Sequence, residues 1–333
     1  MKKNILFFLF LLVLFACNSK REDNHKADSQ LKILVPEEYF AEDFWNETAQ
    51  DFENTFSCKI NLEKFADSQQ ILDSLKTETA DLILGMNNSL LVPVLRESVL
   101  VSYKPTGIYQ VKRKFIFDES YHLIPYDFCY LAVTFNEEEI SFDPQTFGEM
   151  QDGKWENKII VSNPLESGIG KAVFLWSVAT FNGNGFGHFW RSIKNNLFAV
   201  TSTQREAYDL FLAGEAPIVL SESTFENYLN DFYPNKKYSS FIPEEGGFLL
   251  IEAVGILESS QNKKLAEQFV EYLLTEEFQK KILRQKYKYP VNENLNFEPN
   301  LSPEIDVTDN LSLRELNENY FYWLKRWKRI MKK

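Results

Sequence analysis

The chain has 333 residues, enough for two lobes of roughly 150 residues each rather than one small core. It carries 36 basic and 48 acidic side chains, and the formal charge of −12 disfavours nucleic acid as a partner. Three cysteines exclude a disulfide framework and a zinc ribbon, and three isolated histidines exclude the usual spacings of zinc enzymes. These numbers leave an acidic α/β protein of ordinary globular composition.

The first residues predict a targeting signal. Two lysines precede an apolar run over residues 5–15, which is too short to span a bilayer but typical of a signal-peptide core. The run ends in Leu-Phe-Ala-Cys, which resembles a bacterial lipobox. We therefore expect a signal peptide over residues 1–16 and a lipid on Cys17. A short anchor that is never cleaved is the alternative, and both interpretations place the rest of the chain outside the cytoplasm.

Residues 17–30 are polar, charged and without periodicity, so they predict a flexible tether after the lipidated cysteine. Beyond the tether, apolar runs alternate with helical periodicities. Strands are predicted over residues 31–35, 59–65 and 81–86, and helices over residues 41–56 and 68–77. This alternation is typical of a parallel sheet with helices on both faces, where ligands bind beyond the C-terminal ends of strands. We therefore expect the loops that contain Glu37, Asn87 and Asn88 to face a ligand.

The pattern restarts near residue 122. Strands are predicted over residues 122–135, 158–162, 216–221 and 248–257, and helices over residues 144–150, 172–181, 263–285 and 311–333. The two long apolar runs, 122–135 and 248–257, indicate a chain that crosses from one lobe to another and later returns. We expect residues 31–128 plus 252–333 to form the first lobe and residues 129–251 to form the second.

The loop after the strand over residues 158–162 contains Ser167, Gly168 and Gly170 and opens a helix. Free N–H groups at a helix start suit an anion or a polar ligand group. An ordinary pair of loop glycines is the alternative.

Three further features leave their interpretation open. Cys58 and Cys129 are candidates for a disulfide in an oxidising compartment, but their spacing carries no argument. The last helix has six basic residues in its last nine, which fits either contact with anionic lipid or a solvated helix end. The chain contains no GxSxG, HExxH, P-loop or GxGxxG motif, so nothing in it supports catalysis, a metal or a cofactor.

Five strings occur in a familiar order: DLILGMNNSLL (81–91), PYDFCYLAVTF (125–135), EAYDLFLAGEAPIVLS (206–221), EEGGFLLIEA (244–253) and KYPV (288–291). They resemble the thiamine-binding solute receptors of bacterial ABC importers, which carry an L-G-x-D-N-N-L-L turn, a P-F-D-Y-G-Y strand, a G-W-S-E-A-Y-x-L-F-L-x-G-E helix and a W-M-Y-P-V segment. The resemblance implies a two-lobed periplasmic-binding-protein fold, type II-like, with two mixed sheets flanked by helices and a hinge between the lobes. Such a fold closes over a small solute and delivers it to a membrane permease.

On this resemblance, seven residues are expected to bind the ligand between the lobes: Glu37, Asn87, Asn88, Ser167, Gln204, Glu222 and Tyr287. Glu37 and Glu222 stand where the family has tyrosines, and Gln204 stands where it has a tryptophan. Aromatic faces that stack on thiamine are thus largely exchanged for polar groups, two of them carboxylates. This exchange suggests a positively charged ligand, either thiamine or a thiamine-like organic cation, unless the carboxylates point to solvent.

The sequence therefore predicts a monomeric solute-binding lipoprotein of an ABC importer, on the periplasmic or cell-surface side of a bacterial membrane. Its expected partners are a small-molecule ligand, the ABC permease subunits and the membrane that holds its lipid. Three alternatives remain. They are a receptor for another solute such as ferric iron, a surface lipoprotein that binds glycan or protein without transport, and an enzyme.

Overall fold

The computed structural model describes residues 29–37, 39–140 and 145–332 as an α/β protein. The predicted signal peptide over residues 1–16 and Cys17 lie outside the described residues, as does nearly all of the predicted tether. No helix within the described ranges is long and apolar enough to cross a membrane.

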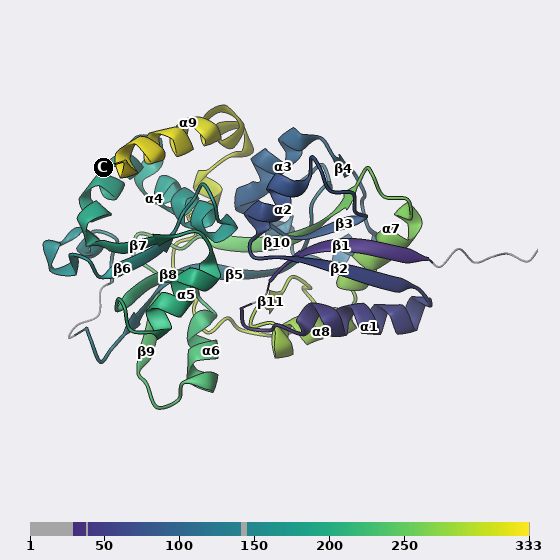
Figure 1. The fold of residues 1–333 in the computed structure, drawn as a ribbon, viewed down its shortest axis with the longest axis horizontal. Helices are drawn as coiled ribbons and strands as arrows, with labels where there is room; N and C mark the ends of the chain where they lie inside the picture. Colours follow the sequence, from purple (N-terminus) through teal and green to yellow (C-terminus); the bar gives the residue numbers. More distant parts are fainter. Residues whose placement is uncertain (1–28, 38, 141–144, 333) are drawn as a thin grey trace, which may run out of the picture.

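One sheet forms the centre of the fold (Figure 1). Its strands are β1 Gln30–Pro36, β2 Lys59–Phe65, β3 Leu82–Asn87, β4 Leu100–Val101, β5 Ile124–Asn136, β6 Ile159–Ser162, β7 Leu197–Thr201, β8 Ile218–Glu222, β9 Tyr238–Phe241, β10 Leu249–Leu257 and β11 Tyr289–Pro290. The main path is β2-β1-β3-β10-β5-β8-β6-β7, and β4, β9 and β11 pair beside it. β1 pairs in parallel with β2 and β3, whereas β5 and β10 run antiparallel to their partners. The sheet is therefore mixed, as the family resemblance implies, and not purely parallel. It is one continuous sheet instead of the two that were expected, because β5 is long enough to pair with β10 and with β8.

Strands β5 and β10 cross the middle of the molecule and join its two sides (Figure 1). The first half of β5 pairs with β10 and β11, and its second half pairs with β8 and β9. All thirteen residues of β5 are buried, which accounts for the nearly continuous apolar run in its sequence. Asp127 lies within this run, so its carboxylate is buried with the strand.

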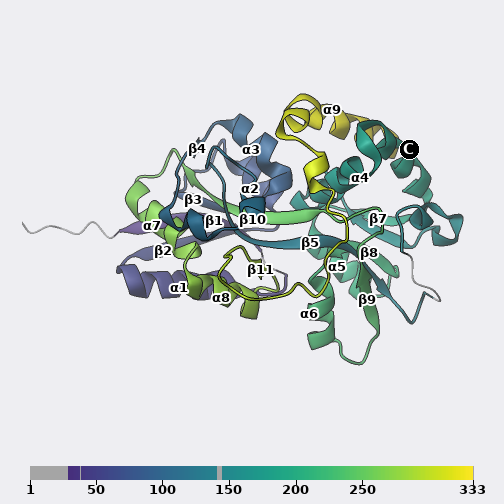
Figure 2. The ribbon, with the colours of Figure 1, turned by 180° about the vertical axis from the view of Figure 1, so that it is seen from behind.

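Helices cover both faces of the sheet (Figure 1). They are α1 Phe44–Phe56, α2 Ser68–Ser74, α3 Leu91–Glu97, α4 Gly168–Ile193, α5 Gln204–Leu212, α6 Phe225–Phe232, α7 Lys263–Leu273, α8 Glu276–Gln285 and α9 Leu313–Met331. Short 3₁₀ turns lie at η1 Asn88–Leu90, η2 Thr106–Gln110, η3 Arg113–Phe115, η4 Glu149–Gln151, η5 Gly153–Trp155, η6 Lys194–Asn196 and η7 Thr308–Asn310. After β11 a long segment carries the chain back across the molecule to α9 (Figure 2).

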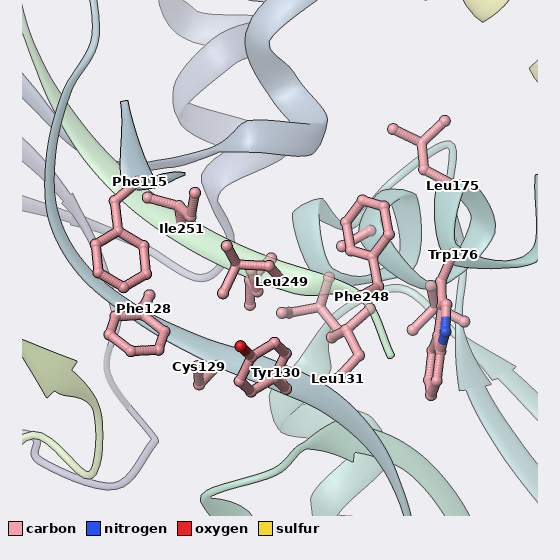
Figure 3. Close-up of a cluster of buried hydrophobic side chains, with 14 of the residues drawn as sticks. Phe115, Phe128, Cys129, Tyr130, Leu131, Leu175, Trp176, Phe248, Leu249 and Ile251 are labelled. Carbon is pink, nitrogen blue, oxygen red and sulfur yellow. The ribbon is translucent and has the colours of Figure 1, made fainter. Parts of the chain in front are cut away.

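Buried apolar side chains follow β5 and β10 from one side of the molecule to the other (Figure 3). Phe115 stacks on Phe128 of β5, with ring centroids 4.2 Å apart. Further along, Phe248 extends the cluster towards Trp176 of α4, whose indole N–H donates to the backbone oxygen of Gly246 at 2.8 Å. One apolar cluster therefore extends through both sides of the molecule.

The fold class predicted from the sequence is confirmed, and two predicted helices differ. The helix predicted over residues 144–150 is wrong, because its described part forms only the 3₁₀ turn η4. The carboxylate of Glu245 accepts the N–H groups of Phe147 and Gly148, each at 3.0 Å, and so stabilises a turn instead. The helix predicted over residues 263–285 divides into α7 and α8, because Thr275 caps a new helix.

The other predicted strands and helices form, several of them with shifted bounds. The division into lobes over residues 31–128 plus 252–333 and residues 129–251 stays a prediction. α9, which that division groups with the first lobe, packs chiefly against α4 and reaches α3, where Arg96 donates to the backbone oxygen of Asn317 at 3.2 Å. Cys58 and Cys129 are both free, buried thiols, so the structure contains no bond between them.

Candidate functional site

A polar cavity lies where the ends of β1 and β3 approach the starts of α4 and α5. Its volume is about 50 Å³, which holds a few water molecules but not a solute of many atoms. The residues that line it are Pro36, Glu37, Tyr39, Phe40, Ala66, Asp67, Ser68, Gly85, Asn87, Ile169, Gln204, Arg205, Glu222, Glu252 and Lys288. The cavity lies beyond strand ends, the place where α/β sheets bind ligands.

Four of the seven residues predicted to bind ligand line this cavity: Glu37, Asn87, Gln204 and Glu222. Ser167 is fully buried just behind the wall, with its hydroxyl donating to Asp67. As ligand contacts, all of these residues stay a prediction.

The structure places the remaining two residues elsewhere. Asn88 binds the backbone of β10, donating to Leu249 at 2.9 Å and accepting from Ile251 at 3.2 Å. It lines a second cavity of about 840 Å³ between α3, α4, β10 and α9. The hydroxyl of Tyr287 donates to Asp231 at 2.8 Å, and its ring contacts the ring of Phe40. The lining of the polar cavity includes neither Asn88 nor Tyr287.

Five ionisable side chains form one connected group, and we call them the buried charge cluster: Asp127, Glu222, Glu252, Lys286 and Lys288. Glu222, Glu252 and Lys288 line the cavity, and Asp127 and Lys286 lie behind them. Lys286 donates to Asp127 at 2.8 Å and to Glu252 at 2.5 Å. Lys288 forms an ion pair with Glu222 and lies 3.4 Å from an oxygen of Glu252. Each acid therefore has an ammonium group of the same chain as its partner.

Two acids of the buried charge cluster have pKa values that are shifted in opposite directions. Burial, together with the neighbouring charge of Glu252, raises the pKa of Asp127 to about 8. Burial also acts to raise the pKa of Glu252, but Lys286 and Lys288 outweigh it and hold that pKa at about 2. One oxygen of Asp127, Oδ1, is buried without a hydrogen-bond partner within the described residues, which fits its weaker hold on a negative charge.

On the opposite wall, the carboxylate of Asp67 joins the starts of α2 and α4. It accepts the N–H groups of Gln69 and Gly168 and the hydroxyl of Ser167, all at 2.8 Å. We call Asp67, Ser167 and Gly168 the helix-end cluster. A side chain at position 168 has no room, since a Cβ there would lie 2.1 Å from the Oγ of Ser68. The helix start that was expected to hold a ligand group thus binds a carboxylate of the chain itself.

Burial shifts the pKa values on this wall as well. It raises the pKa of Asp67, an effect that the bonds from Gln69, Gly168 and Ser167 oppose. Lys171 lies one turn along α4, and burial lowers its pKa to about 8 against the attraction of Asp67. Its Nζ is buried without a hydrogen-bond partner in the described part of the chain.

The rings of Tyr39 and Phe40 line the cavity, and neither residue is among the seven predicted to bind the ligand. Phe40 stacks against Tyr208 and Phe225, with centroids 5.6 and 5.7 Å apart. The hydroxyl of Tyr39 donates to Asp209 of α5 at 3.0 Å. The loop between β1 and α1 is thereby held against α5 and α6.

The two carboxylates that were expected to attract a cation both have positive partners. Glu37 lies 3.4 Å from Arg205, and both side chains remain more than a third exposed. Glu222 pairs with Lys288, and both are almost completely buried. The seven predicted residues do not include Asp67, Arg205, Glu252 and Lys288, which the fold brings to the cavity from separate parts of the sequence. The sequence did contain one signal for a buried lysine: two lysines, 286 and 288, stand directly before the apolar residues Tyr289 to Val291.

A two-sided α/β fold with a polar cavity at strand ends is consistent with the class of solute-binding receptors. The chain belongs to the family described as bacterial extracellular solute-binding protein, whose model matches residues 77–310. A thiamine-binding periplasmic protein of Brucella melitensis is 26% identical over 315 residues, which cover 91% of this chain and 92% of that protein. A thiamine-binding periplasmic protein of Escherichia coli is 26% identical over 290 residues, or 84% and 86% of the two chains.

Solved structures agree on the fold. A periplasmic thiamin binding protein superposes with a TM-score of 0.81 at 21% identity, covering 91% of this chain and 96% of that one. Iron-bound HitA from Pseudomonas aeruginosa superposes with a TM-score of 0.71 at 19% identity, covering 91% and 99%. The resemblance to thiamine-binding receptors is therefore confirmed, and so is the periplasmic-binding-protein fold. The described residues contain no group of His, Cys, Asp and Glu arranged to hold a metal ion.

Proposed function

We propose that this chain is the solute-binding component of an ABC importer and that the polar cavity is its solute site. The observation that carries the proposal is the origin of the cavity walls. They come from both sides of the crossing strands β5 and β10, at strand ends and helix starts. Family membership supports a receptor rather than an enzyme, and the names of the relatives support the periplasm as the compartment.

Thiamine or a related organic cation is the ligand that we propose. The described lining contains four carboxylates, those of Glu37, Asp67, Glu222 and Glu252, against the two cations Arg205 and Lys288. Lys286, directly behind the lining, pairs with Glu252 and leaves one carboxylate in excess, and even a small excess of negative charge in a narrow cleft favours a positive solute. The rings of Tyr39 and Phe40 offer aromatic faces for a cationic ring. The curated relatives named as thiamine-binding proteins support the same ligand class.

The test is calorimetry with thiamine on wild type and on two matched glutamine variants. Gln204→Ala removes an amide from the cavity lining and should weaken binding about tenfold. Gln261→Ala changes an exposed residue between β10 and α7 and should leave the Kd unchanged. Mass spectrometry of the small molecules that co-purify with the protein gives an independent identification. Absence of thiamine binding, or a co-purified iron or anionic solute, contradicts the proposed ligand.

The small cavity volume implies that the walls separate to admit a solute. We propose that the sides joined by β5 and β10 rotate about these strands, which act as the hinge. Saturating thiamine should then change the radius of gyration in solution scattering, because the cavity cannot hold it at its present volume, and should raise the Tm by mass action. An unchanged scattering curve at saturation contradicts the hinge.

We further propose that the mature protein is a monomer anchored through lipid on Cys17 beside its permease. Cys17→Ala should abolish incorporation of a clickable palmitate in growing cells, while Cys58→Ala should not. Equal label on the Cys17 variant contradicts the anchor.

A further inference from the structure

Lys288 places a positive charge of the chain itself in the wall of the polar cavity. Its side chain is almost fully buried, and its Nζ contacts three groups: Glu222, an oxygen of Glu252 at 3.4 Å, and the sulfur of Cys129 at 3.6 Å. Two of these contacts, with Glu222 and Cys129, are hydrogen bonds, and the contact with Glu252 is an ion pair. The positive charge of Lys288 is therefore already surrounded by groups of the chain itself.

The two acids that Lys288 joins come from different strands. Glu222 ends β8 and lies opposite Leu131 of β5, whereas Glu252 lies in β10 opposite Asp127 of β5. Both acids line the cavity. Burial acts to lower the pKa of Lys288, but Cys129, Glu222 and Glu252 outweigh it and raise that pKa, so the ammonium stays charged.

A buried cation between two carboxylates has the same electrostatic effect as a cationic ligand at that place. It removes the cost of burying the acids, and it competes with any positive group that a solute brings. We infer that Lys288 is a specificity-determining residue, an intramolecular counter-ion that limits the affinity of the cavity for cations. This inference rests on the proposed function, since it concerns the same cavity.

The experiment compares thiamine with its uncharged isostere, in which carbon replaces the quaternary ring nitrogen, by calorimetry on the full chain. Lys288→Met keeps an unbranched side chain, one atom shorter, and removes its charge. It should raise the affinity for thiamine relative to the isostere by about tenfold or more, because Glu222 and Glu252 lose their partner. Lys280→Met, in a half-exposed pair with Glu276 on α8, should leave that ratio unchanged.

Two more variants keep the test decisive if Lys288→Met alone folds poorly, as judged by circular dichroism. Glu222→Gln should shift the ratio in the opposite direction, towards the uncharged isostere. The double variant Glu222→Gln with Lys288→Met removes one charge of each sign and should restore the wild-type ratio. A ratio that stays at the wild-type value in folded Lys288→Met or in Glu222→Gln overturns the inference and leaves the proposed function intact.

Failure of the proposed ligand gives a different result, in which wild type binds neither compound. The inference is then decided by Lys288→Met alone. Acquired binding of thiamine but not of the isostere supports the role of Lys288, and absence of any acquired binding contradicts it.

Discussion

Two clusters with buried acids flank the cavity, the buried charge cluster and the helix-end cluster. Their acids are stabilised in different ways. In the buried charge cluster, every carboxylate meets a lysine ammonium group that carries a full opposite charge. In the helix-end cluster, Asp67 meets N–H groups and a hydroxyl, which are dipoles. A dipole left without its acid loses one hydrogen bond, whereas an ion left without its partner is an isolated charge in a medium of low dielectric constant. The first cluster should therefore be more sensitive to the loss of one member.

The largest expected effect is that of Lys286→Met. This change leaves the ionised Glu252 without its closest cation and Asp127 without a hydrogen-bond donor, and it should lower the free energy of unfolding by about 3–5 kcal/mol. Urea denaturation at neutral pH measures the loss. Lys280→Met on the surface of α8 serves as the control and should cost less than about 1 kcal/mol. Equal losses in the two variants would contradict the difference between the clusters.

The next effect is a dependence on pH. The folded-state pKa of Asp127 is about 8, above the value of 3.8 for an ordinary aspartate, so the native protein holds a proton that the unfolded chain releases. The stabilisation from that proton is complete below about pH 4 and is lost as the pH rises through about 8. Wild type should therefore lose stability relative to Asp127→Asn over this window. Melting curves of both proteins at pH 5, 7 and 9 test the prediction, and parallel curves would refute it.

The pKa of Glu252, in the same cluster, is shifted in the opposite direction, so its effect on stability has the opposite dependence on pH. Its pKa of about 2 lies below the ordinary value of 4.5, so its contribution is present above about pH 4.5 and is lost as the pH falls through about 2. Glu252→Gln should thus destabilise the protein at pH 5, 7 and 9 alike. A Glu252→Gln profile that resembles that of Asp127→Asn would show that the two acids share their proton equally.

In the helix-end cluster, Asp67→Ala should cost about 2 kcal/mol, because two N–H groups and a hydroxyl lose a charged acceptor. Asp73→Ala, at an exposed position of the same helix, should cost less than about 1 kcal/mol. Urea denaturation of both variants measures the difference. If Asp67→Ala lowered the free energy of unfolding as much as Lys286→Met, removal of a partner would cost as much in the helix-end cluster as in the buried charge cluster.

The smallest effect is expected for Ser167→Ala, at about 1 kcal/mol, because Ser167 caps α4 and donates to Asp67. Ser312→Ala removes the exposed cap of α9 and provides the comparison. Ser167→Ala should cost the more of the two, since its hydroxyl also satisfies a buried carboxylate. The reverse order would indicate that the bond to Asp67 adds nothing.

The sequence was sufficient to predict the strands at the centre of the fold, because burial on both faces makes them continuous apolar runs, as in β5. It was not sufficient for the segment over residues 145–150. There the spacing of Phe147 and Met150 suits a helix, but Glu245, almost a hundred residues away, binds the N–H groups. Local periodicity carries no information about such a distant acceptor.

The lining of the polar cavity was predicted only in part, again because distant residues meet there. Glu37, Asn87 and Glu222 follow strands, so their position beyond strand ends could be inferred. The charge of the cavity could not be inferred, because Glu222 and Lys288 are separated by 66 positions and meet only through the pairing of β5 with both β8 and β11. The argument from two acids to a cationic ligand therefore lacked the two cations that the fold brings to them.

The volume of the polar cavity has a consequence for the kinetics of capture. A space of about 50 Å³ does not admit a solute of thiamine's size until the walls separate. The observed association rate should then rise with solute concentration only up to a plateau, which equals the rate of that separation. Release of the solute requires the walls of the filled cavity to separate in turn, so a permease that pulls the walls apart would shorten the residence time without any change in the residues of the site.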